Sequence, residues 1–179
     1  MQPIQSLRWH DRLRYRIQTA VITIPAPRDW RYTLILLGLF GLIYLPIGFH
    51  TGFLKLAPQL NPGLVITVAA TALLMPGINE ELIFRVLLLP HPTEPMRPMV
   101  QRLWQMCSWI LFVLYHVPPW TPDFFKTPAF LIGVGLVGIA CTFSYWQSRS
   151  IWTAVFLHWA IVSLWLLVFG GLAKFESVG

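Results

Sequence analysis

The sequence predicts an all-α membrane protein, a polytopic bundle of about five transmembrane helices preceded by a basic amino-terminal arm. Hydrophobic residues make up 56% of the 179 residues and charged residues only 11%, against roughly a quarter charged in an average globular domain. The mean hydropathy is +0.62. Five apolar runs each approach the ~20 residues that cross a bilayer. We therefore expect the arm over residues 1–31 and a single transmembrane domain over residues 32–174.

The arm combines positive charge with aromatic residues. It contains six arginines and only two aspartates, interleaved with tryptophan and tyrosine: Arg8, Arg12, Arg14, Arg16, Arg28, Arg31, Asp11, Asp29, Trp9, Tyr15 and Trp30. A segment of this kind can lie on anionic headgroups, where each basic residue contributes about 1 kcal/mol. A solvated basic tail is the alternative. Membrane lipids are the first expected partner.

The apolar runs predict the helices of the bundle, in chain order 33–49, 64–89, 99–117, 129–146 and 151–172. Proline-rich connectors follow the second and third runs. Each proline removes an amide donor and clashes with the preceding turn, so the helices cannot continue through these connectors. Within the second run, Pro76-Gly77 predicts a kink that frees the carbonyl group of Ala72.

Two cysteines and three histidines lie outside any motif. Cys107 and Cys141 are in apolar runs without metal-ligand spacing, so we expect both to be small buried residues. His10, His50 and His91 are in the arm or the connectors, and we expect them to face solvent.

Lysine and arginine counts predict the orientation. Nine basic residues fall on the side of the amino terminus, the six of the arm with Arg97, Arg102 and Arg149. Three fall on the other side, Lys55, Lys126 and Lys174. The excess predicts a cytoplasmic amino terminus and a carboxyl terminus on the opposite side.

Three formal charges lie inside the second apolar run, at Glu80, Glu81 and Arg85. Charges at that depth are costly, which makes the cluster a functional-site hypothesis. Glu81 and Arg85 are four residues apart, so they can form an ion pair on one helix face. Glu80 points away and is left free. A static salt-bridge knot that holds the bundle together is the structural alternative.

Two histidines on other helices complete the candidate site. His116 ends the third run, and His158 lies in the fifth. A carboxylate and an imidazole can activate one water, and a second imidazole can donate to an oxyanion. Residue counting places Glu80 and His116 at one height, both equidistant from residue 98. At ~1.5 Å per residue, the same counting puts His158 at a depth of about 10 Å and His116 at about 25 Å.

These residues resemble the CPBP (or Abi) family of CAAX prenyl endopeptidases and bacteriocin-processing enzymes, which are glutamate-dependent intramembrane proteases. The resemblance covers residues 64–172. Three family motifs occur in order: EExxxR as Glu80, Glu81 and Arg85, FxxxH as Phe112 and His116, and a histidine of the last helix as His158.

The resemblance implies a role for each motif residue. Glu80 would be the general base that activates water, with His116 as its partner. The predicted ion pair would orient the site and balance its charge, and His158 would stabilise the oxyanion. The family usually adds an asparagine four residues later, where this chain has Val162. Loss of one oxyanion donor typically costs about 3 to 4 kcal/mol.

A zinc or two-metal site is the alternative chemistry, with ligands Glu80, Glu81, His116 and His158. The chain has no HExxH motif, and the ion pair with Arg85 would occupy one ligand. The leading interpretation therefore needs no cofactor. Nucleic-acid binding is not supported, because the basic arm accounts for the pI near 9.8.

Two functions follow. The leading hypothesis is an intramembrane endopeptidase of the CPBP type that cleaves a membrane-embedded or lipidated substrate in a cavity facing the cytoplasm. The alternative is a noncatalytic scaffold or assembly factor of a membrane protein complex that retains a degenerate site, for which Val162 is the reason.

Overall fold

The structure is a computed structural model that describes residues 8–176, and in this range it contains helices and no strands. The elements in chain order are α1 (Trp9–Ile22), α2 (Pro27–His50), α3 (Pro62–Ala72), η2 (Leu73–Ile78), α4 (Asn79–Glu81), η3 (Leu82–Leu87), α5 (Pro98–Tyr115), η4 (Asp123–Lys126), α6 (Pro128–Ser148), α7 (Ile151–Leu167) and α8 (Gly171–Glu176).

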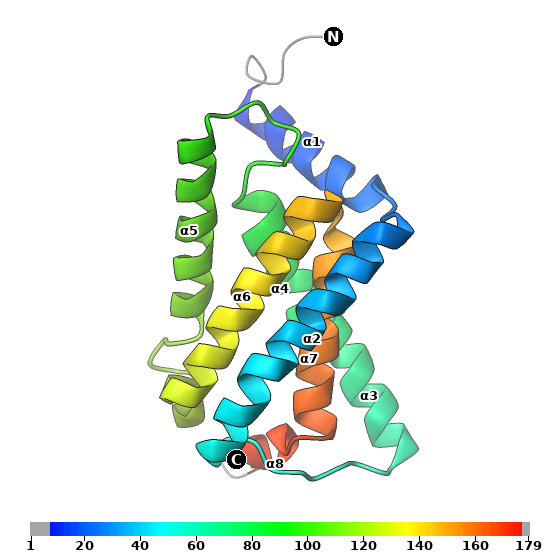
Figure 1. Cartoon of the computed structure of the whole chain (residues 1–179), viewed down its shortest axis with the longest axis vertical. Helices are drawn as coiled ribbons and strands as arrows, with labels where there is room; N and C mark the ends of the chain where they lie inside the picture. Colours follow the sequence, from blue (N-terminus) through cyan, green and yellow to red (C-terminus); the bar gives the residue numbers. More distant parts are fainter. Residues whose placement is uncertain (1–7, 177–179) are drawn as a thin grey trace.

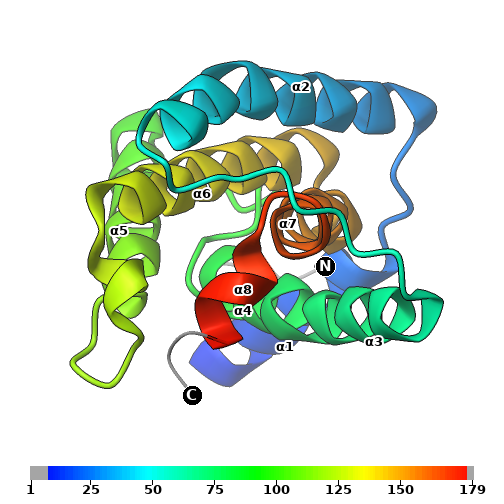
Figure 2. The same cartoon turned by 90° about the horizontal axis from the view of Figure 1, so that it is seen from below.

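The helices form a bundle around α6 and α7. Helix α6 packs against α2, α5 and α7, whereas α3 packs against α7. Figure 2 shows α7 end-on, between the α2 and α6 layer and the α3 and α4 segment. Helix α1 lies across one end of the bundle, and α8 lies at the other (Figure 1). The site helices therefore approach one another in the middle of the bundle.

Three helical segments are long and apolar enough to cross a membrane: Pro27–His50, Pro62–Leu87 and Pro128–Ser148. Helices α5 and α7 complete the bundle, and α7 has a shorter apolar stretch of 17 residues. The predicted all-α membrane helix bundle is confirmed. Three predicted runs begin within two residues of a helix that starts at a proline, Pro62, Pro98 or Pro128. Helix α2 begins earlier than predicted, at Pro27 inside the expected arm, and α7 ends at Leu167, before the predicted end.

The second long segment is interrupted where the sequence predicts a kink. Met75 has φ −144° and ψ 111°, outside the helical region, and π-helical turns flank the short α4. A Cβ atom at Gly77 would lie 3.0 Å from the carbonyl oxygen of Ala72, so glycine permits this close approach. The break separates α3 from the turn that carries Glu80 and Glu81.

Helix α1 is fastened to the end of that same segment. Arg16 donates from Nε and Nη2 to the two carboxylate oxygens of Glu94, at 2.6 and 2.9 Å. Its Nη1 donates to the carbonyl oxygen of Leu87 at 3.2 Å. Because Leu87 ends η3, Arg16 satisfies a carbonyl group at the end of this turn. We call Arg16, Leu87 and Glu94 the α1 latch.

The connector after η3 corrects one prediction. His91 is 1% exposed, not solvent-facing, because the connector folds back between α1 and the end of α6. Its Nδ1 pairs with the hydroxyl group of Thr93 at 2.7 Å, and its Nε2 lies 3.3 Å from the carbonyl oxygen of Arg149. Burial lowers the pKa of His91. His10 and His50 are exposed, as predicted.

The two cysteines differ in burial. Cys141 is buried on α6 as predicted, whereas Cys107 is exposed on α5. Helix α5 turns Ser108 and Phe112 inward, so its other faces lie outside the bundle. The prediction for Cys107 is wrong because an apolar run looks the same in sequence whether its face meets lipid or protein.

Candidate active site

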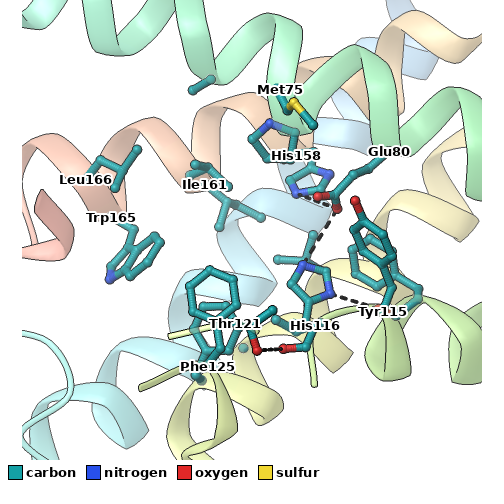
Figure 3. Close-up of a pocket in the computed structure, with 18 of the residues that line it drawn as sticks. Met75, Glu80, Tyr115, His116, Thr121, Phe125, His158, Ile161, Trp165 and Leu166 are labelled. Atoms are coloured by element: carbon teal, nitrogen blue, oxygen red, sulfur yellow. Dashed lines mark hydrogen bonds and ion pairs between the residues drawn. The ribbon is translucent and has the colours of Figure 1, made fainter. Parts of the chain in front are cut away.

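The predicted site residues converge from three helical segments. Glu80 and Glu81 lie on α4, and Arg85 lies one turn later on η3. His116 follows the last residue of α5, and His158 lies in the middle of α7. Figure 3 shows Glu80, His116 and His158 facing one another at one end of a cavity.

Glu81 and Arg85 form the predicted ion pair in full burial. Arg85 Nε lies 3.2 Å from Glu81 Oε2, and both side chains are 0% exposed. The guanidinium carbon of Arg85 lies 4.7 Å from the centre of the Phe112 ring, which adds a cation–π contact. Phe112, the first residue of the FxxxH motif, thus covers the ion pair.

Both histidines are held through Nδ1. His158 Nδ1 lies 2.7 Å from Glu81 Oε1, and His116 Nδ1 lies 2.8 Å from the carbonyl oxygen of Phe112. A carboxylate and a carbonyl group only accept, so Nδ1–H donates in each pair. The Nε2 atom of each ring is left to face Glu80.

Glu80 is the acid that both Nε2 atoms approach. Glu80 Oε2 lies 3.7 Å from His116 Nε2 and 4.0 Å from His158 Nε2. These distances are too long for direct hydrogen bonds but shorter than the about 5.6 Å that two hydrogen bonds through one water can span. Glu80 Oε2 is buried, and no group of the described residues hydrogen-bonds to it. The arrangement therefore suits a donor molecule held between one carboxylate and two imidazoles.

Charge balance adds a constraint. Two carboxylates and one guanidinium leave one negative charge in a cluster whose side chains are almost entirely buried. One further proton, shared among Glu80 and the two imidazoles, brings the cluster to neutrality, which a surrounding of low polarity favours. Because His158 Nδ1–H already donates to Glu81, a donor at its Nε2 requires a proton on both ring nitrogens.

The depth expected for His158 is wrong. Counting from the helix ends separates His158 from His116, whereas the structure brings both within 4.0 Å of one carboxylate oxygen. The counting assumed helices that begin at one level. In Figure 1, α5 begins higher along the long axis of the bundle than α7 does, so the end of α5 meets the middle of α7.

A cavity of about 440 Å³ opens from this site. Most of its wall is apolar. Phe125 and Phe130 lie beside His116, with ring centres 6.1 and 5.9 Å away, and Phe53, Trp165 and Phe175 continue this aromatic wall in the far part of the cavity. Val162 also lines it. The cavity extends from Glu80 toward the end of the bundle that carries α8, away from α1 (Figures 1 and 3). The cavity and the predicted arm therefore lie toward opposite ends of the bundle.

The structure gathers a different set of possible metal ligands from the one expected. Within the described residues, Glu81, Cys141 and His158 bring ligand atoms within 4.8 Å of one another, without Glu80 and His116. The guanidinium group of Arg85 already neutralises Glu81 from 3.2 Å. A divalent cation would have to share Glu81 with this positive charge, so the donor set fits a metal poorly.

Sequence reasoning missed several supporting contacts. It did not predict the hydrogen bond between Glu81 and His158, residues 77 positions apart. It also missed Ser108, which donates to the carbonyl oxygen of Phe84 at 2.7 Å in the π-helical turn. The position of Ser108, one and two turns before Phe112 and His116, was a usable signal. Nothing in the sequence marks Cys141 as a neighbour of Glu81.

Comparison with known families gives a match over more than half of the chain. The family model described as type II CAAX prenyl endopeptidase Rce1-like matches residues 61–164. This range contains Glu80, Glu81, Arg85, His116 and His158, and it excludes α1 and α2. No curated protein and no solved structure matches the chain.

Proposed function

Since the chain belongs to the Rce1-like family of type II CAAX prenyl endopeptidases, we propose that it is an intramembrane endopeptidase that hydrolyses a peptide bond of a membrane-embedded or lipidated substrate. The observation that carries the proposal is the buried Glu80 oxygen, which lies within 4.0 Å of two imidazole nitrogens and has no hydrogen-bond partner among the described residues.

The first step activates water. A water between Glu80 and His116 gives a proton to the Glu80 carboxylate as its oxygen attacks the scissile carbonyl carbon. His116 accepts a hydrogen bond at Nε2 and is kept in that tautomer by the carbonyl oxygen of Phe112. The two groups together orient the lone pair of the water toward the substrate.

The second step stabilises and collapses the intermediate. Electrons of the carbonyl bond move to its oxygen, and His158 donates from Nε2 to the resulting oxyanion. Glu81 fixes the His158 ring and balances its charge, and Arg85 in turn balances Glu81. When the carbon–nitrogen bond breaks, the proton held by Glu80 passes to the leaving amine.

The cavity supports an apolar substrate. Its aromatic far part can accept a hydrocarbon chain, while the peptide bond lies at the polar end beside Glu80. A prenyl group beside the scissile bond combines both features. The name of the matched family points to the same substrate class.

The reaction as proposed uses no metal. Support comes from Arg85, which already neutralises the carboxylate that a cation would need. Zinc bound through Glu81 and His158 would break the hydrogen bond that orients the imidazole. The assay below therefore includes a chelator arm.

A test of the proposed function uses a farnesylated, internally quenched peptide ending in a Cys-a-a-X sequence, with purified protein in detergent micelles. Glu80→Gln should reduce kcat by at least about 100-fold, the usual contribution of a general base. Glu176→Gln, at an exposed glutamate of α8, is the control and should match the wild type. Turnover by the wild type should survive a chelator.

Three results would count against the proposal. Full turnover by Glu80→Gln would show that Glu80 is not the general base. If a chelator abolishes activity and stoichiometric zinc restores it, the reaction depends on zinc and the metal-free mechanism is rejected. No cleavage by the wild type removes the prenyl-peptide substrate class.

A noncatalytic scaffold is the second candidate, and Val162 in the cavity wall favours it because it offers no hydrogen bond to an intermediate. Complementation of a deletion strain separates the two functions. Full rescue by Glu80→Gln, together with copurification of a stoichiometric membrane partner, supports the scaffold. Failure of Glu80→Gln to rescue supports the peptidase.

A further inference from the structure

An oxyanion that forms beside Glu80 has one identified donor and needs more. Oxyanion holes combine preorganised donors, and removal of a single one costs about 100-fold to 1,000-fold in kcat. His158 provides one donor under the proposed function, on which this inference rests. Val162, one turn later on α7, faces the cavity and has no donor to add.

Most hydroxyl groups in the cavity wall are already committed. Each of three such groups donates to a backbone carbonyl oxygen: Tyr44 to Ala129 at 3.0 Å, Thr71 to Thr67 at 2.9 Å and Thr121 to Pro118 at 2.7 Å. A hydroxyl group has one proton to donate, so none of the three can turn to an oxyanion without breaking its own bond.

The two indole groups of the wall are badly placed. Trp120 is 83% exposed in the connector after His116. Trp165 has an unpartnered Nε1, but it lies two turns along α7 from His158, about 10 Å away along the helix axis. In Figure 3, its nitrogen points away from Glu80 and His158.

Tyr115 is the remaining hydroxyl group. It precedes His116, lines the cavity, and in Figure 3 its phenol oxygen points toward the Glu80 carboxylate. Its ring is held edge-on by the His116 and Phe84 rings, each with centres 5.5 Å away. Within residues 8–176, no hydrogen bond engages this hydroxyl group, so its proton is available.

We propose that Tyr115 is a catalytic residue that donates a hydrogen bond from its hydroxyl group to the oxyanion, opposite the donor at His158 Nε2. The attack by water forms one carbon–oxygen bond, and the carbonyl electron pair moves to the oxygen that these two groups contact. Tyr115 keeps its proton throughout. The leaving amine is protonated from Glu80, as in the mechanism above.

The test measures kcat and KM for the same farnesylated peptide in five proteins: wild type, Tyr115→Phe, Val162→Asn, Tyr115→Phe with Val162→Asn, and Tyr145→Phe. Tyr115→Phe should lower kcat by about 100-fold and leave KM within about threefold, because the bond forms only in the transition state. In the Val162→Asn background, the same change should cost less than about 10-fold, because asparagine supplies a substitute donor.

Tyr145→Phe is the matched control. It removes a buried, unpartnered hydroxyl group on α6 outside the cavity, so kcat should stay at the wild-type value. Tyr115→Phe keeps the aromatic ring and removes only the hydroxyl group. An unchanged midpoint of thermal unfolding shows that this variant folds.

The outcomes separate this inference from the proposed function. A Tyr115→Phe enzyme with wild-type kcat, beside an inactive Glu80→Gln enzyme, overturns the role of Tyr115 and keeps the peptidase. An equal loss in both backgrounds also overturns it, since the loss would then not concern a replaceable donor. If Glu80→Gln is fully active or the wild type is inactive, the proposed function fails and this inference with it.

Discussion

Glu81 makes the shortest contacts in the charged cluster. It holds Arg85 through one carboxylate oxygen and His158 through the other, at 3.2 and 2.7 Å. Its neighbour Glu80 lies farther from its partners, 3.7 Å from His116 Nε2 and 4.0 Å from His158 Nε2, and it does not pair with Arg85. The two acids differ because successive residues of a helix point about 100° apart. One acid therefore organises the site, and the other faces the cavity.

The Glu81–Arg85 pair gives a prediction for stability. Glu81→Gln should lower the free energy of unfolding by about 3 to 5 kcal/mol, because it leaves a buried guanidinium unpaired. Glu81→Gln combined with Arg85→Met should recover most of this loss, since no unpaired charge remains. Thermal or denaturant unfolding of the three proteins in one detergent checks it.

Activity should not follow stability in that series. The double variant lacks the carboxylate that balances a second proton on His158, so peptide hydrolysis should stay low. A single variant as stable as the wild type would contradict the ion pair. A fully active double variant would contradict the role of Glu81 toward His158.

At the scale of elements, two features position the turn that carries the glutamates. One is the break in the segment between α3 and η3, and the other is helix α1, which lies across the end of that segment. The break at Met75 lets α4 turn its glutamates toward α5 and α7. The α1 latch holds the other end, with Arg16 and Glu94 only 14% and 8% exposed. The turn that carries Glu80 and Glu81 is thus bounded on one side by a backbone break and held on the other by a helix outside the matched family region.

The α1 latch predicts energetic coupling between α1 and the connector. A double-mutant cycle with Arg16→Ala and Glu94→Ala should show an interaction energy of at least about 1 kcal/mol in unfolding, because the two charges form a two-pronged, mostly buried pair. The Lys126–Asp123 pair of η4 is the control, at 3.0 Å but largely exposed, and should show no measurable coupling. Additive effects of the Arg16 and Glu94 changes would reject the latch.

Across the whole molecule, charge and cavity lie at opposite ends. The basic residues of α1, of the starts of α2 and α5, and Arg149 belong to one end, and Lys55, Lys126 and Lys174 belong to the other (Figure 1). The cavity extends toward the lysine end. We propose, from the positive-inside rule, that the amino terminus is cytoplasmic and the cavity therefore opens away from the cytoplasm.

Cysteine labelling in intact cells tests this topology. Arg14→Cys on α1 and Lys55→Cys in the connector after α2 are both at exposed positions. In a Cys107→Ser background, with Cys141 buried, a membrane-impermeant maleimide should label Cys at position 55 directly and at position 14 only after permeabilisation. The reverse pattern would place the cavity on the cytoplasmic side and reject the orientation that the charge count predicts.

Helix positions and the identity of the charged cluster could be predicted because both depend on local physics. A proline favours the start of a helix, and an apolar run of sufficient length spans a bilayer. A charge inside such a run is costly and therefore indicates a functional site. The ion pair between Glu81 and Arg85 was predictable for the same reason, since four residues on a helix define a distance. His91 and Cys107 were not, because burial depends on which neighbour covers a side chain.

The sequence by itself determined that this chain is a membrane helix bundle with two acids, a base and two histidines held within its apolar segments, because backbone hydrogen bonding and the cost of buried charge act along the chain. Only the tertiary structure decided that α5 is displaced along the bundle, that His158 reaches Glu81 and Glu80, and that the cavity opens away from α1. These depend on offsets between helices up to 77 residues apart, and no local rule sets such offsets; they follow from the packing of α5, α6 and α7 as a whole.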